Sequence, residues 1–194
     1  MSDNLTLTQH QFEFKFASGG DVGAFSGYGS VFNTLDSHGD IIKPGAFSKT
    51  LAQHKAAGSM PLMFLNHAGL PFGTTSALDL VPIGIWTKMA EDSNGLAVSG
   101  RLIGLDTERG RIIYNGMLEG ALTGLSIGYK TVRTSKGNKP SDPRFIHEAK
   151  LYEISVVSMP SHEQAIVDSI KTHGTATAHA RVMQALENLK RTLS

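Results

Sequence analysis

The sequence contains a Gly-x-Ser-x-Gly pattern at residues 124–128, with Ser126 at its centre. In α/β-hydrolases this pattern makes a sharp turn from a strand into a helix and exposes a nucleophilic serine. Here the order is reversed, because a helical pattern precedes Ser126 and a strand pattern follows it. The pattern alone therefore allows two interpretations: a nucleophile, or a serine that hydrogen-bonds locally where glycines permit close packing.

A nucleophilic serine needs a base within hydrogen-bond distance, and histidine is the side chain best suited to that task near neutral pH. Of the eight histidines, His67 follows the most apolar run of the chain, Met60–Asn66, and precedes a loop with glycine and proline that could border a cleft. It is therefore the candidate base, and a histidine satisfied by contacts at a strand end is the alternative. Six others lie in arms, linkers or polar segments: His10, His38, His54, His162, His173 and His179.

A third group must orient the imidazole and stabilise its protonated form. The segments 122–132 and 145–159 read as two strands of a hairpin around a polar loop. Pairing them symmetrically, with Val132 opposite Phe145, puts Ser126 across from Leu151.

With this pairing, Glu153 shares the face of Ser126 one diagonal step away, and Glu148 lies on the other face. Glu153 is also surrounded by apolar residues, so it needs a partner if it is buried. It is the candidate third residue. Glu148 and His147 stay as alternatives, because a slip of one residue in register would exchange the faces.

Alternating and β-branched segments predict the strands that must position these side chains. The hairpin turn Asp92–Gly95, which contains Asn-Gly, separates two such segments. The strand segments are residues 11–16, the glycine-rich piece that ends at 30–32, 60–66, 83–90, 96–103, 122–132 and 145–159.

Helices are predicted at four places. One is short, at residues 47–57, and a second runs from about 107 to 119 with Asp106 as its cap and Gly120 as its stop. The others are residues 163–171, capped by Ser161, and the amphipathic segment 179–193. Without a repeating βαβ unit, the pattern predicts a mainly β fold with some α (α+β), an antiparallel barrel or sheet decorated by helices.

Length and composition predict one soluble domain with a core. The chain has 194 residues, 40% of them hydrophobic, and a net charge of +1, so neither nucleic acid nor an anionic membrane is an expected partner. No signal peptide or spanning helix is recognisable, and we expect a cytosolic protein. The expected boundaries are a flexible arm at 1–11, a domain at 12–171, and a linker with a helix at 172–194.

No cofactor or metal is expected. The chain has no cysteine, and no two histidines have the spacing of metal ligands on a helix. The segment Asp36–Asp40 lacks the later ligands of a calcium loop, so a hydrogen-bonded turn is the better interpretation.

In their order and spacing, the motifs from about Phe12 to Ile170 resemble the prohead maturation proteases of tailed bacteriophages, which are related in fold to the herpesvirus assembly protease. The resemblance rests on residues 29–32, Asp36, 39–42, 44–47, 65–67, Gly73, 124–129, 151–157 and Pro160. One departure is Ala68, where many members carry an acidic or amide residue.

The resemblance implies an antiparallel barrel of about seven strands, with Ser126 as nucleophile, His67 as base and Glu153 orienting His67. The herpesvirus relatives look to use a second histidine in the third position. The implied function is a serine endopeptidase in the host cytoplasm, inside the assembling procapsid. It would cleave the scaffolding protein or the scaffold segment of the capsid protein, and itself. A homodimer and a self-cleaved or docking tail at 172–194 are further implications.

Three other classes of protein compete with this interpretation. A noncatalytic capsid-assembly or scaffold protein on the same fold is the main alternative. An α/β-hydrolase esterase would need a strand before Ser126, and a metal-dependent hydrolase would need ligands that the sequence does not show.

Overall fold

Two β-sheets and two helices form the part of the chain that the computed structural model describes, which is residues 22–68, 76–139, 141–160 and 165–170. The predicted strand at 11–16 and the predicted helix at 179–193 lie outside these residues. The expected division into arm, domain and tail therefore stays a prediction. Within the described residues, no helix is long and apolar enough to cross a membrane.

The first sheet is antiparallel and has the strand order β3-β4-β1-β7. It contains β1 (Ala24–Val31), β3 (Gly84–Glu91), β4 (Gly95–Leu102) and β7 (Val167–Ile170). The predicted Asn-Gly hairpin between β3 and β4 is confirmed. Asp92 closes its turn, because its Oδ1 accepts hydrogen bonds from the main-chain N–H groups of Asn94 and Gly95.

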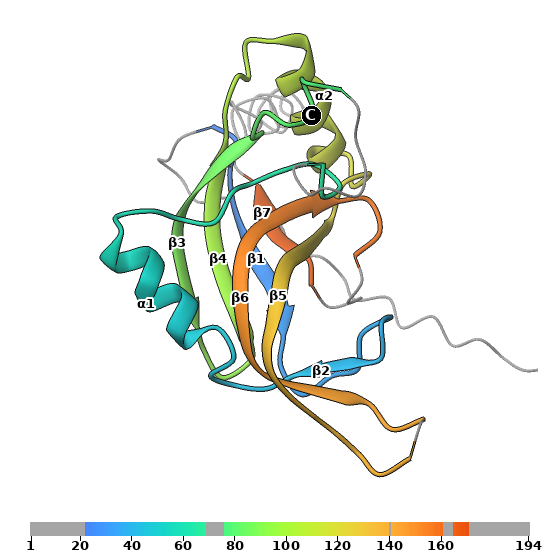
Figure 1. Cartoon of the computed structure of the whole chain (residues 1–194). Helices are drawn as coiled ribbons and strands as arrows, with labels where there is room; N and C mark the ends of the chain where they lie inside the picture. The colour runs from blue at the N-terminus through green and yellow to red at the C-terminus, as the bar shows by residue number, and fades with distance from the viewer. Residues whose placement is uncertain (1–21, 69–75, 140, 161–164, 171–194) are drawn as a thin grey trace, which may run out of the picture.

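The second sheet has the order β2-β6-β5 and consists of β2 (Asp40–Ile42), β5 (Gly124–Lys136) and β6 (Arg144–Val157). Strands β5 and β6 form the predicted long antiparallel hairpin, whose far end extends beyond the rest of the fold in Figure 1. Strand β2 pairs with β6 in parallel. The polar loop is shorter than predicted, since both strands continue into it.

Single bridges rather than a continuous ladder connect the two sheets. Leu62 and Leu65 each bridge to β6, Met63 bridges to Gly84 of β3, and Ile166 bridges to Gly124 of β5. The fold is mostly β with few helices. Among the described residues the strands form two separate sheets and not one closed barrel, so the predicted barrel is not confirmed.

The segment 60–66, predicted as a buried strand, contributes only these bridges. Pro61 has no N–H to donate to a ladder. At its other end, Asn66 and His67 have φ angles of 51° and 58°, in the left-handed region, so the extended segment ends there in a turn that the Ala68 N–H closes by donating to Leu65 O.

The two helices lie close to their predicted positions. Helix α1 (Ser48–Ala56) begins against β3, where the Glu91 carboxylate accepts from the Phe47 N–H and the Ser48 hydroxyl. Helix α2 (Glu108–Leu118) is capped by Thr107, whose Oγ1 accepts from the Gly110 N–H. The predicted cap, Asp106, was wrong by one residue, because Thr107 has the extended backbone that a cap requires.

The predicted helix at 163–171 is wrong, because residues 167–170 form strand β7 against β1. The reason is tertiary: Gly27 of β1 lets the carbonyl of Ile166 approach so closely that any Cβ would overlap it. The Tyr28 N–H donates to that carbonyl at 3.1 Å. Pairing with an existing sheet thus outweighs a short helical pattern.

The hydrophobic core brings together residues of both sheets and α2, and α1 lies beside β3 and β6 (Figure 1). Its members include Phe25, Phe47, Trp86, Leu96, Val98, Ile113, Met117, Leu125, Ile154 and Val156. Because β6 is buried along most of its second half, polar side chains in that half must find partners inside the protein.

An ion pair between the buried Asp40 carboxylate and the half-exposed Arg144 guanidinium holds β2 against β6. The Asp40 side chain, 3% exposed, accepts from Nε and Nη2 of Arg144 at 2.7 and 2.5 Å. The Tyr129 hydroxyl also donates to Asp40 at 3.2 Å. Burial and the neighbouring Asp40 carboxylate both raise the pKa of Tyr129, so its hydroxyl stays a donor.

We predict that Arg144→Met lowers the free energy of unfolding by about 2 to 3 kcal/mol, because it leaves the Asp40 carboxylate buried without its charged partner. Urea unfolding followed by the fluorescence of Trp86, the single tryptophan, measures the change. Lys136→Met is the matched control, since Lys136 is exposed and pairs directly with Arg144 across the hairpin. Equal losses in the two variants would contradict the prediction.

Candidate active site

Ser126 is the third residue of strand β5 and is buried, with 6% of its surface exposed. Helix α2 ends at Leu118, so a helix precedes the serine and a strand contains it, as predicted. The Gly-x-Ser-x-Gly pattern is therefore not the strand-to-helix turn of an α/β-hydrolase, and the context that an esterase of that class requires is missing here.

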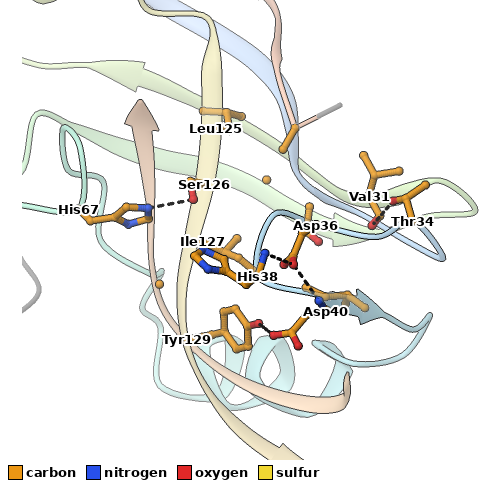
Figure 2. Close-up of a pocket in the computed structure, with 15 residues that line it drawn as sticks. Val31, Thr34, Asp36, His38, Asp40, His67, Leu125, Ser126, Ile127 and Tyr129 are labelled. Carbon is orange, nitrogen blue, oxygen red and sulfur yellow. Dashed lines mark hydrogen bonds between the residues drawn. The ribbon is translucent and has the colours of Figure 1, made fainter. Parts of the chain in front are cut away.

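His67 reaches the serine because the chain makes a left-handed turn at Asn66 and His67. Such φ angles are unfavourable for residues with side chains and persist where surrounding contacts hold them. Asn66 is held by its N–H to Val156 O at 2.9 Å and by its side-chain oxygen, which accepts from the Ser158 N–H. The turn brings Nε2 of His67 within 2.9 Å of Ser126 Oγ (Figure 2).

Glu153 lies on the other side of the imidazole ring. Its Oε1 is 2.6 Å from Nδ1 of His67, and its side chain is 1% exposed. With the Nδ1 proton directed at the carboxylate, Nε2 presents its lone pair to the Ser126 hydroxyl. The arrangement can therefore remove the hydroxyl proton and stabilise the imidazolium that results.

The pairing between β5 and β6 differs from the predicted one. Ser126 pairs with Ser155 and not with Leu151, a difference of four residues (155 − 151 = 4), and Gly128 pairs with Glu153. The shift is even, so Glu153 still shares the face of Ser126, as expected. The symmetric pairing failed because the strands extend to Lys136 and Arg144 and contain three irregularities in register.

The two alternative third residues point to other partners. Glu148 forms an ion pair with Lys49 of α1 at 3.1 Å. His147 Nε2 lies 2.7 Å from the hydroxyl of Ser135, toward the exposed end of the hairpin. The structure thus brings Ser126, His67 and Glu153 together and leaves Glu148 and His147 outside this cluster.

Sequence reasoning missed Ser155, which is fully buried beside Glu153. Its hydroxyl donates to Oε2 of Glu153 at 2.5 Å and accepts from the His67 N–H at 3.2 Å. Alternation places Ser155 on the face of Glu153, but its position directly opposite Ser126 follows only from the observed register.

Both glycines of the pattern are required by packing. A Cβ on Gly128 would overlap the carboxylate of Glu153, and a Cβ on Gly124 would overlap the ring of Pro160. The interpretation of the glycines as close-packing positions is therefore confirmed. It does not compete with a functional Ser126, since the space at Gly128 is the space that the Glu153 carboxylate occupies.

A pocket of about 450 Å³ opens beside Ser126 and His67. It runs along the first residues of β5 to the end of β1 and the turn that contains Asp36 and His38 (Figure 2). Asp36 makes the predicted hydrogen-bonded turn, as its Oδ1 accepts from the N–H groups of His38 and Asp40. No group of three or more potential metal ligands occurs among the described residues.

Comparison with known proteins identifies relatives. A family model described as caudovirus prohead serine protease matches residues 11–180. The prohead protease of Enterobacteria phage HK97 is 35% identical over 167 residues, which cover 86% of this chain and 68% of that protein. The structure of the bacteriophage T4 capsid assembly protease superimposes with a TM-score of 0.53 at 15% identity, covering 69% of this chain and 80% of that one.

The likeness to the T4 structure, at 15% identity, supports the fold alone. The family match and the HK97 relative extend across most of the sequence and therefore show the family. The resemblance expected from the motifs is therefore confirmed. This chain belongs to the caudovirus prohead serine protease family.

Proposed function

We propose that the chain is a serine endopeptidase that matures procapsids, with Ser126 as nucleophile, His67 as general base and Glu153 as the residue that orients His67. The observation that carries this proposal is the continuous chain of hydrogen bonds from Ser126 Oγ through His67 to Glu153, at 2.9 and 2.6 Å. Serine, histidine and a carboxylate in this order make up the known machinery of acyl transfer.

In the first half of the reaction, Ser126 Oγ attacks the peptide carbonyl carbon while its proton passes to Nε2 of His67. The C–N bond then breaks, and the leaving amine takes the proton from Nε2. In the second half, water attacks the acyl-serine and gives its proton to Nε2. The C–O bond to Ser126 breaks, and Oγ recovers its proton. Glu153 stabilises the imidazolium in both halves.

The substrate we propose is the scaffold segment of the capsid protein or a separate scaffolding protein, and the protease chain itself. The family description and the names of the relatives support this class of substrate. The site of action is then the assembling procapsid in the host cell. The predicted self-cleaved or docking tail at 172–194 lies outside the described residues and stays a prediction, as does a homodimer.

We also propose that the two sheets are parts of one barrel of the herpesvirus assembly protease type. The bridges of residues 62–65 to β6 and β3, and of Ile166 to β5, support this view, because they lie at both junctions between the sheets.

Replacing either proposed reacting residue should abolish processing. We expect co-expression of Ser126→Ala or His67→Ala with the neighbouring capsid gene products to yield uncut chains, as shown by fragment mass. Ser135→Ala and His147→Ala are matched controls, because these two residues form another serine–histidine contact, at 2.7 Å on the same hairpin. Equal cutting by Ser126→Ala and wild type would favour the noncatalytic assembly protein instead.

The third residue can be identified by removing charge and retaining shape. Glu153→Gln should lower the rate at which Ser126 attacks an electrophile by about 10³- to 10⁴-fold, because a neutral amide neither fixes the tautomer nor stabilises the imidazolium. Rates of Ser126 labelling by a fluorophosphonate measure this loss. Glu148→Gln and His147→Ala should retain the wild-type rate, and a large loss in either would move the assignment to that residue.

Gly128→Ala should reduce the labelling rate by about 100-fold, since the added Cβ displaces the Glu153 carboxylate from His67. Gly58→Ala is the control: it strains a φ of 60°, but its Cβ meets no atom within 4 Å. Both variants should unfold more easily than wild type, and only Gly128→Ala should lose reactivity. A Gly128→Ala protein with full reactivity would contradict the prediction, because it would show that the Glu153 carboxylate can keep its contact with His67 beside the added Cβ.

A further inference from the structure

Ser155 contacts the carboxylate of Glu153 and the main chain of His67 through a single oxygen atom. Its hydroxyl hydrogen is directed to Oε2 of Glu153, and a lone pair of the same oxygen accepts from the His67 N–H. The residue is 0% exposed and lies directly opposite Ser126 in the β5–β6 ladder. No water can replace this hydroxyl without opening the packed interior.

The first contact determines how the carboxylate is turned. Glu153 is almost fully buried, and a buried ionised carboxylate needs a donor for each oxygen. Oε1 faces His67, and Ser155 supplies the donor for Oε2. Without that donor, rotation about the last side-chain bond would let Oε1 leave the imidazole nitrogen.

The second contact stabilises the turn that carries the base. His67 has a φ of 58°, a backbone conformation that is unfavourable for a histidine. The bond from its N–H to Ser155 Oγ ties this main-chain group to β6 at 3.2 Å. The same hydroxyl therefore holds the base and its orienting carboxylate in one geometry.

We infer that Ser155 is a positioning residue, a fourth member of the hydrogen-bonded group, which acts through Glu153 and His67 without touching the substrate. The inference rests on the proposed function, because positioning matters only if Ser126 reacts through His67. It also explains why a small hydroxyl residue stands between Ile154 and Val156, which are apolar and β-branched.

The test is a double-mutant cycle between Ser155→Ala and Glu153→Gln, with a fluorophosphonate as the probe of Ser126. Ser155→Ala alone should lower the maximal labelling rate by about 10- to 100-fold, the range for losing a hydrogen bond to a charged group. The fluorophosphonate concentration that gives the half-maximal labelling rate should stay constant, because Ser155 does not touch the probe. In the Glu153→Gln background the same change should cost less than about threefold, since the two residues act as a unit.

Two further variants separate positioning from a general loss of stability. Ser155→Thr retains the hydroxyl and should restore most of the labelling rate. Thr50→Val removes another buried hydroxyl that is bonded to β6, where Thr50 Oγ1 accepts from the Leu151 N–H at 3.2 Å. It should lower the unfolding temperature about as much as Ser155→Ala does, but keep the wild-type labelling rate.

An unchanged labelling rate in Ser155→Ala overturns the inference, as does an equal fold-loss in both backgrounds, which would indicate a purely structural role. If Ser155→Thr fails to fold, the double-mutant cycle still tests the inference, because it uses only Ser155→Ala and Glu153→Gln. Labelling of Ser126→Ala at the wild-type rate would refute the proposed function and the inference together. If Ser126→Ala loses labelling while Ser155→Ala keeps the wild-type rate, the inference about Ser155 is refuted and the proposed function is not.

Discussion

The carboxylate of Glu153, buried in the second half of β6, is the constraint on which the site depends. An ionised group in that environment is stable only if hydrogen-bond donors surround it. Here the donors are the imidazole of His67 and the hydroxyl of Ser155. Because both oxygens are hydrogen-bonded, the carboxylate has one favourable orientation. That orientation directs Nε2 of His67 at the hydroxyl of Ser126.

Other local features follow from placing this carboxylate. Gly128, directly across the ladder from Glu153, provides the space that it fills. The left-handed turn at Asn66 and His67 places the imidazole in contact with the Glu153 carboxylate. Hydrogen bonds with Val156 and Ser158 hold Asn66 in place. The strain of the turn and the cost of burying a charge are thus offset by one network of hydrogen bonds, which makes the geometry rigid before substrate arrives.

The fold was predictable where the signal is local. The Asn-Gly hairpin of β3 and β4, helices α1 and α2, and the helix-then-strand order around Ser126 all follow from turn residues and periodicity within short windows. Predictions failed where distant segments decide. Residues 167–170 are a strand because β1 offers an edge at Gly27, and residues 62–65 form only bridges because the chain turns at Asn66.

The sequence by itself identified the candidate nucleophile and base, Ser126 and His67. It also determined the face of β6 on which Glu153 lies, because alternation along a strand is a local property. Only the tertiary structure decided which residues meet. The true pairing of Ser126 with Ser155 depends on where the hairpin turns, beyond Lys136 and Arg144, and on the register irregularities between residues 128 and 134. The approach of His67 depends on a turn held by β6. The Ser126–Ser155 pair joins residues 29 positions apart (155 − 126 = 29), and the contacts of His67 with Ser126 and Ser155 join residues 59 and 88 positions apart. No local pattern encodes contacts over such separations.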